Sequence, residues 1–378
     1  MAVYLDCAAT APIDPHVLDV CVQHFQQDYG NAASRTHGAG NAARKTVERA
    51  RDQIATVAGC RRGDVVFTSG ATESNNLAIL GLAETGRKTG KMHLVSTSIE
   101  HRAVLEPLEE LARRGFSVTL VRPTSGGWVD PRAIAEAVRD DTLLVSVMHV
   151  NNETGVVQPI REISEQLAGK AVYFHTDAAQ GFAKESVALR DERIDLISIS
   201  GHKISGPKGI GALIVRRRGK DRPPLTPLMF GGGHERGLRP GTLPVPLIAA
   251  FGYASELWAG EAEERWRSGL DFRRRLLDGL APLRPVINGD EARCLPFILN
   301  VSIPGTDSES TMSAWSDLVA VSSGAACSSQ SYTCSHVLAA MGISSANAAT
   351  AIRFSWCHMS EMPDTAAMVD ALQQAGVH

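Results

Sequence analysis

The chain has 378 residues, and its 38 Lys and Arg against 41 Asp and Glu give a formal net charge of −3. Hydrophobic residues make up 44% and charged residues 21%, which is typical of a folded globular protein and excludes a disordered chain. A charge near zero argues against a dedicated polyanion binder, so we expect no direct contact with nucleic acid. Residues 1–12 show no apolar signal segment and no apolar run is long enough to cross a bilayer, so we expect a cytoplasmic protein without membrane contact.

Seven cysteines are scattered along the chain, at positions 7, 21, 60, 294, 327, 334 and 357. An odd number without any C-x-x-C pair favours reduced thiols over a disulfide framework. Cys327, Cys334 and His336 are residue types that bind zinc, but they lack the usual ligand spacing. We therefore predict no metal site.

Short apolar or β-branched runs alternate with longer amphipathic segments through the first two thirds of the chain. Helices are predicted from residue 71 to Leu80 and over 102–114. The predicted strands cover 64–68, 92–97, 116–121, 143–150, 172–175, 196–200 and 211–215. This alternation predicts βαβ crossovers and a mostly parallel sheet whose strands are buried on both faces.

The pattern changes near residue 260. A charged helical stretch over 261–280 precedes two strand-like segments, at 298–303 and 351–355, which predicts a smaller α+β unit. The basic run 216–220 follows the last strand of the first part, and we interpret it as a solvated loop rather than a phosphate-binding segment.

Three predicted strand ends carry polar residues, and ligands of parallel α/β sheets bind beyond the carboxyl ends of the strands. The first end is the segment 68–75, with the sequence Thr-Ser-Gly-Ala-Thr-Glu-Ser-Asn. A small-residue turn before a helix presents free backbone N–H groups, and the Thr72 hydroxyl adds a donor, so this segment suits a phosphate. A helix start capped by Ser69 or Thr72 explains the same residues equally well.

The other two ends supply an acid and a lysine. Asp177 leaves an apolar strand, where it suits either a buried cation or the cap of the next helix. Lys203 directly follows the strand 196–200 in a chain that has eight Lys against thirty Arg. A desolvated lysine amine can lose its proton and form a Schiff base with a carbonyl group. Phosphate cradle, carboxylate and lysine together match pyridoxal 5′-phosphate, which we predict as the cofactor.

The ordered set of motifs resembles the cysteine desulfurases of the NifS/IscS type, which are fold-type I pyridoxal-phosphate enzymes similar to class-V aminotransferases. The resemblance runs through nearly the whole chain and includes segments 4–6, 31–37, 68–74, 100–101, 149–153, 200–203, 231–237 and 352–355. It implies an α/β fold whose large domain, residues 15–262, binds the cofactor on a mostly parallel seven-stranded sheet. Residues 1–14 and 263–378 would form a smaller α+β domain that carries the catalytic cysteine loop.

The resemblance also implies a role for each matching residue. Lys203 would form the Schiff base, Asp177 would pair with the pyridinium nitrogen, and Gln180 would bind the phenolic oxygen of the cofactor. His101 would stack on the pyridine ring and relay protons. The phosphate would be held by Gly70, Ala71, Thr72, Ser200 and His202, and by Thr242 from the partner subunit of a homodimer.

Cys327 matches the sulfur-accepting cysteine of the family. Its thiolate would attack the sulfur of L-cysteine, giving L-alanine and a persulfide that passes to an acceptor protein. Asn152 and Arg353 match the groups that bind the substrate α-carboxylate, for which a planar guanidinium is well suited. A second thiol, Cys334, either resolves the persulfide or packs within a helix.

The sequence leaves alternatives open. Cys7 and Ala11 replace the residues common in the family at positions that bear on the substrate entrance, so rate or substrate preference would differ. The unusual stretch after Cys327 suggests a DNA phosphorothioation system, whereas iron–sulfur assembly and tRNA thiolation draw on similar enzymes. A selenocysteine lyase or aminotransferase-like enzyme would share the fold without needing Cys327, and a weakly catalytic scaffold would bind no cofactor.

Overall fold

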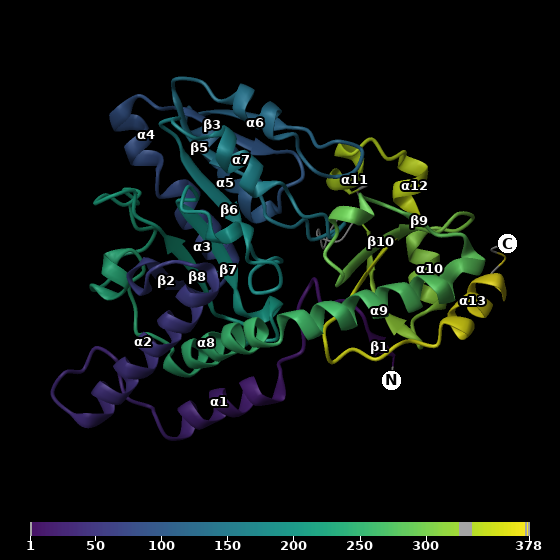
Figure 1. The fold of residues 1–378 in the computed structure, drawn as a ribbon, viewed down its shortest axis with the longest axis horizontal. Helices are drawn as coiled ribbons and strands as arrows, with labels where there is room; N and C mark the ends of the chain where they lie inside the picture. The colour runs from purple at the N-terminus through teal and green to yellow at the C-terminus, as the bar shows by residue number, and fades with distance from the viewer. Residues whose placement is uncertain (1, 325–334, 375, 377–378) are drawn as a thin grey trace.

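The computed structural model describes residues 2–324, 335–374 and 376 of the chain. Its elements form a large sheet, a smaller sheet and a short strand pair, with helices packed around them (Figure 1). The strands are β1 Val3–Tyr4, β2 Val65–Thr68, β3 His93–Thr97, β4 Ser117–Val121, β5 Thr142–Ser146, β6 Tyr173–Asp177, β7 Leu196–Ser200, β8 Gly211–Val215, β9 Val286–Ile287, β10 Ile298–Ser302, β11 Val319–Ala320, β12 Ser322–Ser323 and β13 Ala351–Ser355.

The helices follow the strands in the alternation that the sequence predicts. They are α1 Pro15–Gln26, α2 Gly38–Ala58, α3 Ala71–Leu80, α4 Ala83–Thr89, α5 Arg102–Arg113, α6 Pro131–Ala137, α7 Ile160–Gln166, α8 Val245–Gly260, α9 Ala262–Leu280, α10 Ser308–Ala314, α11 His336–Ala340, α12 Ser345–Ala349 and α13 Thr365–Gln374.

Within the described residues the large sheet has seven strands in the order β2-β8-β7-β6-β5-β3-β4. The strands β7, β6, β5, β3 and β4 pair in parallel, and β8 runs antiparallel to both of its neighbours. The predicted mostly parallel seven-stranded sheet is therefore confirmed. Because β6 and β7 are parallel neighbours, their carboxyl ends place Asp177 and the chain after Ser200 at one edge of the sheet.

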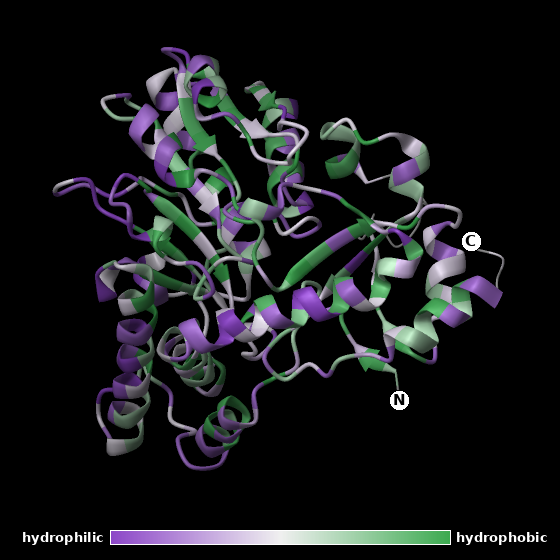
Figure 2. Ribbon diagram, turned by 45° about the vertical axis from the view of Figure 1, so that its right-hand side comes forward, coloured by the Kyte–Doolittle hydropathy of each residue, from purple (hydrophilic) through white to green (hydrophobic). Residues whose placement is uncertain are grey.

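The large sheet is buried on both faces. In β7, Ile197 and Ile199 join the apolar cluster that includes α2 and α8, whereas Leu196 joins the cluster that includes α3 and α5. All three side chains are fully buried. The strands of this sheet accordingly have a largely hydrophobic colour in Figure 2. Burial on both faces explains why these strands have apolar runs without alternation.

The smaller sheet has the order β12-β13-β10-β9, and its strands pair antiparallel. Helix α13 packs against α9 and α10, and Trp315 Nε1 donates a hydrogen bond to the carbonyl of Met368 at 2.8 Å. Strand β1 pairs in parallel with β11, so that Val3 lies opposite Val319. Residues near position 3 thus belong spatially with the second part of the chain, as Figure 1 shows.

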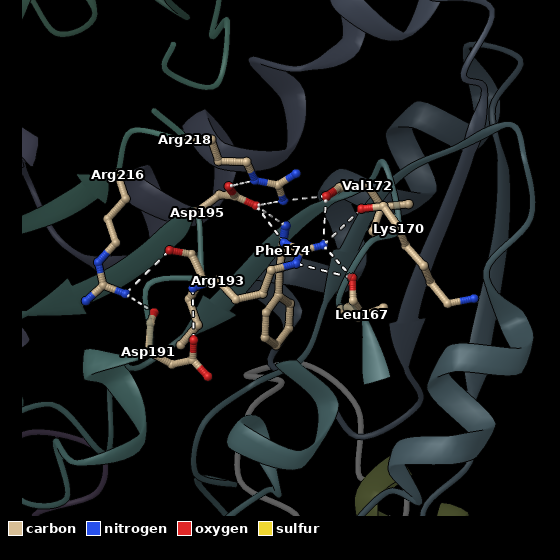
Figure 3. A network of polar contacts seen from close by, with 10 residues as sticks. Leu167, Lys170, Val172, Phe174, Asp191, Arg193, Asp195, Arg216 and Arg218 are labelled. Atoms are coloured by element: carbon tan, nitrogen blue, oxygen red, sulfur yellow. Dashed lines mark hydrogen bonds and ion pairs between the residues drawn. The ribbon is translucent and has the colours of Figure 1, made fainter. Parts of the chain in front are cut away.

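A network of polar contacts lies at the opposite edge of the large sheet, where β6 and β7 begin (Figure 3). The carboxylate of Asp195, which is 1% exposed, accepts hydrogen bonds from Phe174 N at 2.7 Å and from Arg218 Nε at 2.5 Å. Arg193 Nη1 also approaches it at 3.3 Å. Arg216 is buried and donates to the carbonyl of Leu189 at 2.6 Å. The expectation of a solvated loop at 216–220 is therefore wrong for its first residue, because backbone carbonyls bind its guanidinium.

Among the helices that the structure describes, none is long and apolar enough to cross a membrane.

Candidate active site

A cavity of about 630 Å³ opens at the carboxyl ends of the parallel strands. It is lined by residues that follow β2, β6 and β7, by Ala8, Ala9 and Thr10, and by Ser322 from β12. The structure brings most of the predicted site residues together here, namely Gly70, Ala71, Thr72, His101, Asn152, Asp177, Gln180, Ser200, His202, Lys203 and Arg353.

Lys203 ends the short 3-10 turn Gly201–Lys203 that follows β7. Its Nζ donates hydrogen bonds to the carbonyl of Ala8 at 2.5 Å and to that of Ala9 at 2.7 Å. These carbonyls come from the loop after β1, about two hundred residues earlier in the chain. The lysine amine is thereby held in the cavity, where a carbonyl ligand would meet it.

Asp177 is the last residue of β6 and is 6% exposed. Its Oδ2 accepts a hydrogen bond from Asn75 Nδ2 at 2.7 Å, and its Oδ1 accepts one from Ala179 N at 2.9 Å. The structure thus fixes the carboxylate beneath the cavity with two donors. Asn75 has no role in the sequence prediction, although its position in α3, one turn after Thr72, places it on the same side of that helix.

The start of α3 has a geometry that suits an anion. Gly70 precedes the helix with φ 154° and makes no side-chain cap, so that the first N–H groups of α3 stay available for a ligand. Thr72 and Ser200 line the cavity beside this turn. A Cβ on Gly70 would lie 3.7 Å from Ser200 Oγ and would require a backbone conformation that L residues rarely adopt.

Gln180 has one end of its amide bonded and one end unpaired. Its Nε2 donates to the carbonyl of Ala8 at 2.8 Å, and its buried Oε1 has no partner within the described chain. An amide nitrogen carries two hydrogens, so one remains for a ligand oxygen. Buried polar atoms without partners are rare in folded proteins, and here they mark a position that a ligand would fill.

Two histidines of the cavity are neutral at pH 7. His101 caps α5 by accepting a hydrogen bond from Ala103 N at 3.1 Å, and burial lowers its pKa, an effect that Lys203 increases and Asp177 opposes. Burial, with Lys203 beside it, lowers the pKa of His202 to about 4. His202 Nδ1 lies 3.2 Å from Thr10 Oγ1, which orients the ring. A neutral imidazole can accept a proton as well as donate one.

Glu100, directly before His101, is fully buried. It accepts hydrogen bonds from Thr97 Oγ1 at 2.7 Å and from Met148 N at 2.8 Å, while its Oε2 has no partner in the described residues. Burial raises the pKa of this carboxyl to about 8. The acid is thus protonated at pH 7 and adds no negative charge behind the cavity.

Arg353 of β13 is 2% exposed and reaches the cavity from the smaller sheet. Its Nη2 binds Asp6 Oδ1 at 2.7 Å and Ser322 Oγ at 3.1 Å, and its Nη1 donates to the carbonyl of Asn152 at 3.0 Å. Its buried Nε has no partner in the part of the chain that the structure describes. The carboxylate of Asp6 balances its charge.

Of the predicted site residues that the structure describes, Thr242 does not line this cavity and lies on the exposed surface. Cys327 and Cys334 lie outside the described residues. Ser322, five residues before Cys327, lines the cavity. Cys7 and Ala11, which we expected at the substrate entrance, are buried and pack with Cys357 in an apolar cluster, whereas Ala8, Ala9 and Thr10 between them line the cavity.

The residues present fit pyridoxal phosphate. The cavity combines a free helix start for a phosphate, a fixed carboxylate for a pyridinium nitrogen and a lysine amine for an aldehyde. The second hydrogen of Gln180 Nε2 is available to an oxygen of such a ligand, since only one is donated to the carbonyl of Ala8. In the described residues, no cluster of three or more His, Cys, Asp or Glu is arranged for a metal ion.

Residues 3–367 match the model of the aminotransferase class-V family. The chain belongs to this family. The cysteine desulfurase IscS of Vibrio cholerae is 47% identical over 94% of this chain and 88% of its own length. The crystal structure of DndA from Streptomyces lividans is 46% identical with a TM-score of 0.82, covering 94% of this chain and 99% of that one. SspA in complex with cysteine is 36% identical with a TM-score of 0.84, and the same shares of the two chains are covered.

These comparisons confirm the predicted family and fold, and they confirm a pyridoxal-phosphate-dependent enzyme of the cysteine desulfurase type. They confirm the fold-type I assignment as well, since the structural neighbours match almost the whole chain.

Proposed function

We propose that this chain converts L-cysteine to L-alanine and transfers the sulfur, as a persulfide on Cys327, to an acceptor protein. The observation that carries the proposal is the cavity in which Lys203, Asp177 and Arg353 converge from both sheets. The similarity to IscS and to cysteine-bound SspA supports L-cysteine as the substrate.

Pyridoxal phosphate, when bound, withdraws electrons from the α-carbon of an amino acid and so makes its substituents easier to remove. Lys203 would hold its aldehyde carbon, and Asp177 would keep its ring nitrogen protonated. The start of α3 with Thr72, Ser200 and His202 would bind its phosphate. Gln180 would donate to its phenolic oxygen.

The substrate is held by Arg353, whose guanidinium would bind the α-carboxylate together with the Asn152 side chain. The neutral imidazole of His101 would lie against the cofactor ring and move protons there, since burial keeps its pKa low. The thiolate of Cys327 would attack the substrate sulfur, the carbon–sulfur bond would break, and a proton delivered to the carbon would complete L-alanine.

A homodimer is supported by exposed apolar side chains on one monomer. Phe230 is 85% exposed, Tyr29 82% and Phe25 62%, although each is a residue type that normally avoids water. Thr242 is exposed as well, which suits the proposed role of binding the phosphate in the partner's site. The proposed domains, residues 15–262 and residues 1–14 with 263–378, are supported by the break between α8 and α9 at Glu261 and by the pairing of β1 with β11.

The acceptor protein belongs either to iron–sulfur assembly or to thio-modification of tRNA or DNA. The similarity to IscS and the similarity to DndA are nearly equal, so both pathways stay proposals. A cytoplasmic location is supported by the free thiols of the described cysteines, Cys7, Cys21, Cys60, Cys294 and Cys357.

The deciding experiment mixes the purified protein with L-cysteine and dithiothreitol and measures sulfide and alanine. Wild type, Cys327→Ser and the control Cys21→Ser are compared, after the visible spectrum has been recorded. We expect a yellow protein that forms both products, with the activity lost only in Cys327→Ser. A Cys327→Ser protein that still consumes cysteine would point to a lyase or an aminotransferase-like enzyme instead. A colourless protein would indicate a scaffold.

A further inference from the structure

Two cysteines from distant parts of the chain lie side by side next to the active-site cavity. Cys7 follows β1 and Cys357 follows β13, and the residues are 3% and 7% exposed. The backbone holds the two segments together, because Cys7 N donates a hydrogen bond to the carbonyl of Ser355 at 3.0 Å. The two side chains form one apolar cluster with Ala11.

The hydroxyl group of Ser360 lies near both sulfur atoms, and the two cysteine side chains also interact with each other. Ser360 Oγ lies 4.0 Å from Cys7 Sγ and 3.8 Å from Cys357 Sγ. The Cys7 thiol also donates a hydrogen bond to the sulfur of Cys357, which raises the pKa of Cys7 and lowers that of Cys357. The positive charge of Lys184 interacts electrostatically with both sulfurs and favours a thiolate. The pair thus consists of one nucleophilic sulfur and one neighbouring thiol.

We propose that Cys7 and Cys357 form a reversible redox-modification site whose co-reactant is a small peroxide. The Cys357 thiol gives up its proton and its thiolate attacks the peroxide, the oxygen–oxygen bond breaks, the leaving hydroxide takes up that proton to form water, and a sulfenic acid forms. The Cys7 sulfur then attacks the sulfur of Cys357, the sulfur–oxygen bond breaks, and water leaves with the Cys7 proton. Two thiols and one hydrogen peroxide give one disulfide and two water molecules. Reduction by a dithiol restores the pair.

The site is connected to the active-site cavity through the backbone. Cys7 directly precedes Ala8, whose carbonyl accepts hydrogen bonds from both Lys203 and Gln180. A disulfide holds its two Cβ atoms about 3.8 Å apart, so oxidation fixes the position of Cys7 more tightly than packing does. Oxidation would therefore constrain the residue directly before the carbonyl that orients the lysine amine.

The test uses the wild-type holoenzyme. The protein is treated with hydrogen peroxide, its remaining thiols are blocked with iodoacetamide in denaturant, and its peptides are mapped by mass spectrometry. We expect a peptide in which Cys7 is linked to Cys357, and we expect the link to disappear with dithiothreitol. We also expect a shift of the visible absorption band of the bound cofactor, because the disulfide would constrain the loop whose carbonyls contact Lys203.

Cys357→Ser is expected to lose the linked peptide and the absorption shift, whereas Cys21→Ser, which replaces another buried cysteine, is expected to keep both. Peroxide treatment that oxidises other thiols without producing the linked peptide would overturn the proposed site. A linked peptide with an unchanged absorption band would overturn the connection to Lys203. The peptide map is made on the wild type and requires no turnover of cysteine, so its outcome is separate from that of the proposed function.

Discussion

The two edges of the large sheet differ in whether their buried polar groups have hydrogen-bond partners. At the edge where β6 and β7 begin, both oxygens of Asp195 are bound by arginine and backbone donors (Figure 3). At the edge where the same strands end, Gln180 Oε1, Asn75 Oδ1 and Glu100 Oε2 are buried without partners among the described residues. A buried polar group without a partner is costly. The hydrogen bonds at the first edge therefore stabilise the fold. The unpaired polar atoms at the second edge lower the stability of the fold but are available to a ligand.

The largest effect is expected from Lys203→Ala at the second edge. Loss of the amine removes both the covalent attachment of the cofactor and a proton-transfer group, so the rate of alanine formation should fall by about 100- to 10,000-fold. The free energy of unfolding of the cofactor-free protein should stay near that of the wild type. Alanine release and denaturant unfolding measure the two quantities. A variant that unfolds much more easily would show that Lys203 supports the fold instead.

At the first edge, Asp195→Ala should lower the free energy of unfolding by about 1–3 kcal/mol, because the buried N–H of Phe174 loses its acceptor and the partly exposed Arg193 and Arg218 lose their carboxylate partner. Its activity at a temperature where it is folded should match the wild type. Urea unfolding gives the stability, and Asp141→Ala, which removes an exposed partner of Arg139, is the control with little expected change. Equal free energies of unfolding for Asp195→Ala and Asp141→Ala would show that the hydrogen bonds of Asp195 do not stabilise the fold.

Arg353→Lys tests a buried arginine that reaches the cavity from the smaller sheet. A lysine keeps the charge but loses the planar fork, so KM for L-cysteine should rise about tenfold to a hundredfold, with a smaller change in kcat. Arg132→Lys, on the exposed side of α6, is the control. A fall in kcat at unchanged KM would place Arg353 outside substrate binding.

The smallest effect is a pH dependence due to Glu100. Burial raises its folded-state pKa to about 8, so the folded protein retains the proton more strongly than the unfolded chain does. Its contribution to stability is fully present below the ordinary pKa of a glutamic acid and is lost as the pH rises through about 8. The free energy of unfolding of Glu100→Gln should therefore change less with pH than that of the wild type over this range. If the melting temperatures of the two proteins changed with pH in the same way, the Glu100 carboxyl would not be the cause of the pH dependence.

The strands of the large sheet could be predicted because burial on both faces leaves continuous apolar runs. The prediction for 196–200 agrees with β7 residue by residue, whereas the run 143–150 is a strand only to Ser146. Val147 and Met148 are buried although they lie beyond the end of that strand. An apolar run indicates burial and does not show whether the residues form hydrogen bonds with a neighbouring strand. Two-residue strands such as β1 and β11 have no periodicity to detect.

Some residues of the candidate site could likewise be predicted from the sequence, and others could not. Lys203 and Asp177 follow strands directly, so the sequence indicates their positions, and the structure places both in one cavity. The carbonyl of Ala8 and the support that Asn75 gives to Asp177 were not predicted. A backbone carbonyl has no signature in side-chain patterns, and an asparagine within a helix more often lies on a solvated face than at a site.

The pairing of β1 with β11 has a consequence for biosynthesis. Val3 finds its partner only when Val319 has left the ribosome, and Cys7 N finds the Ser355 carbonyl later still. A nascent chain can thus form the large sheet long before the loop with Ala8 is fixed against Lys203. The lysine acquires its neighbours near the end of translation, which delays a competent catalytic centre until almost all of the polypeptide has been made.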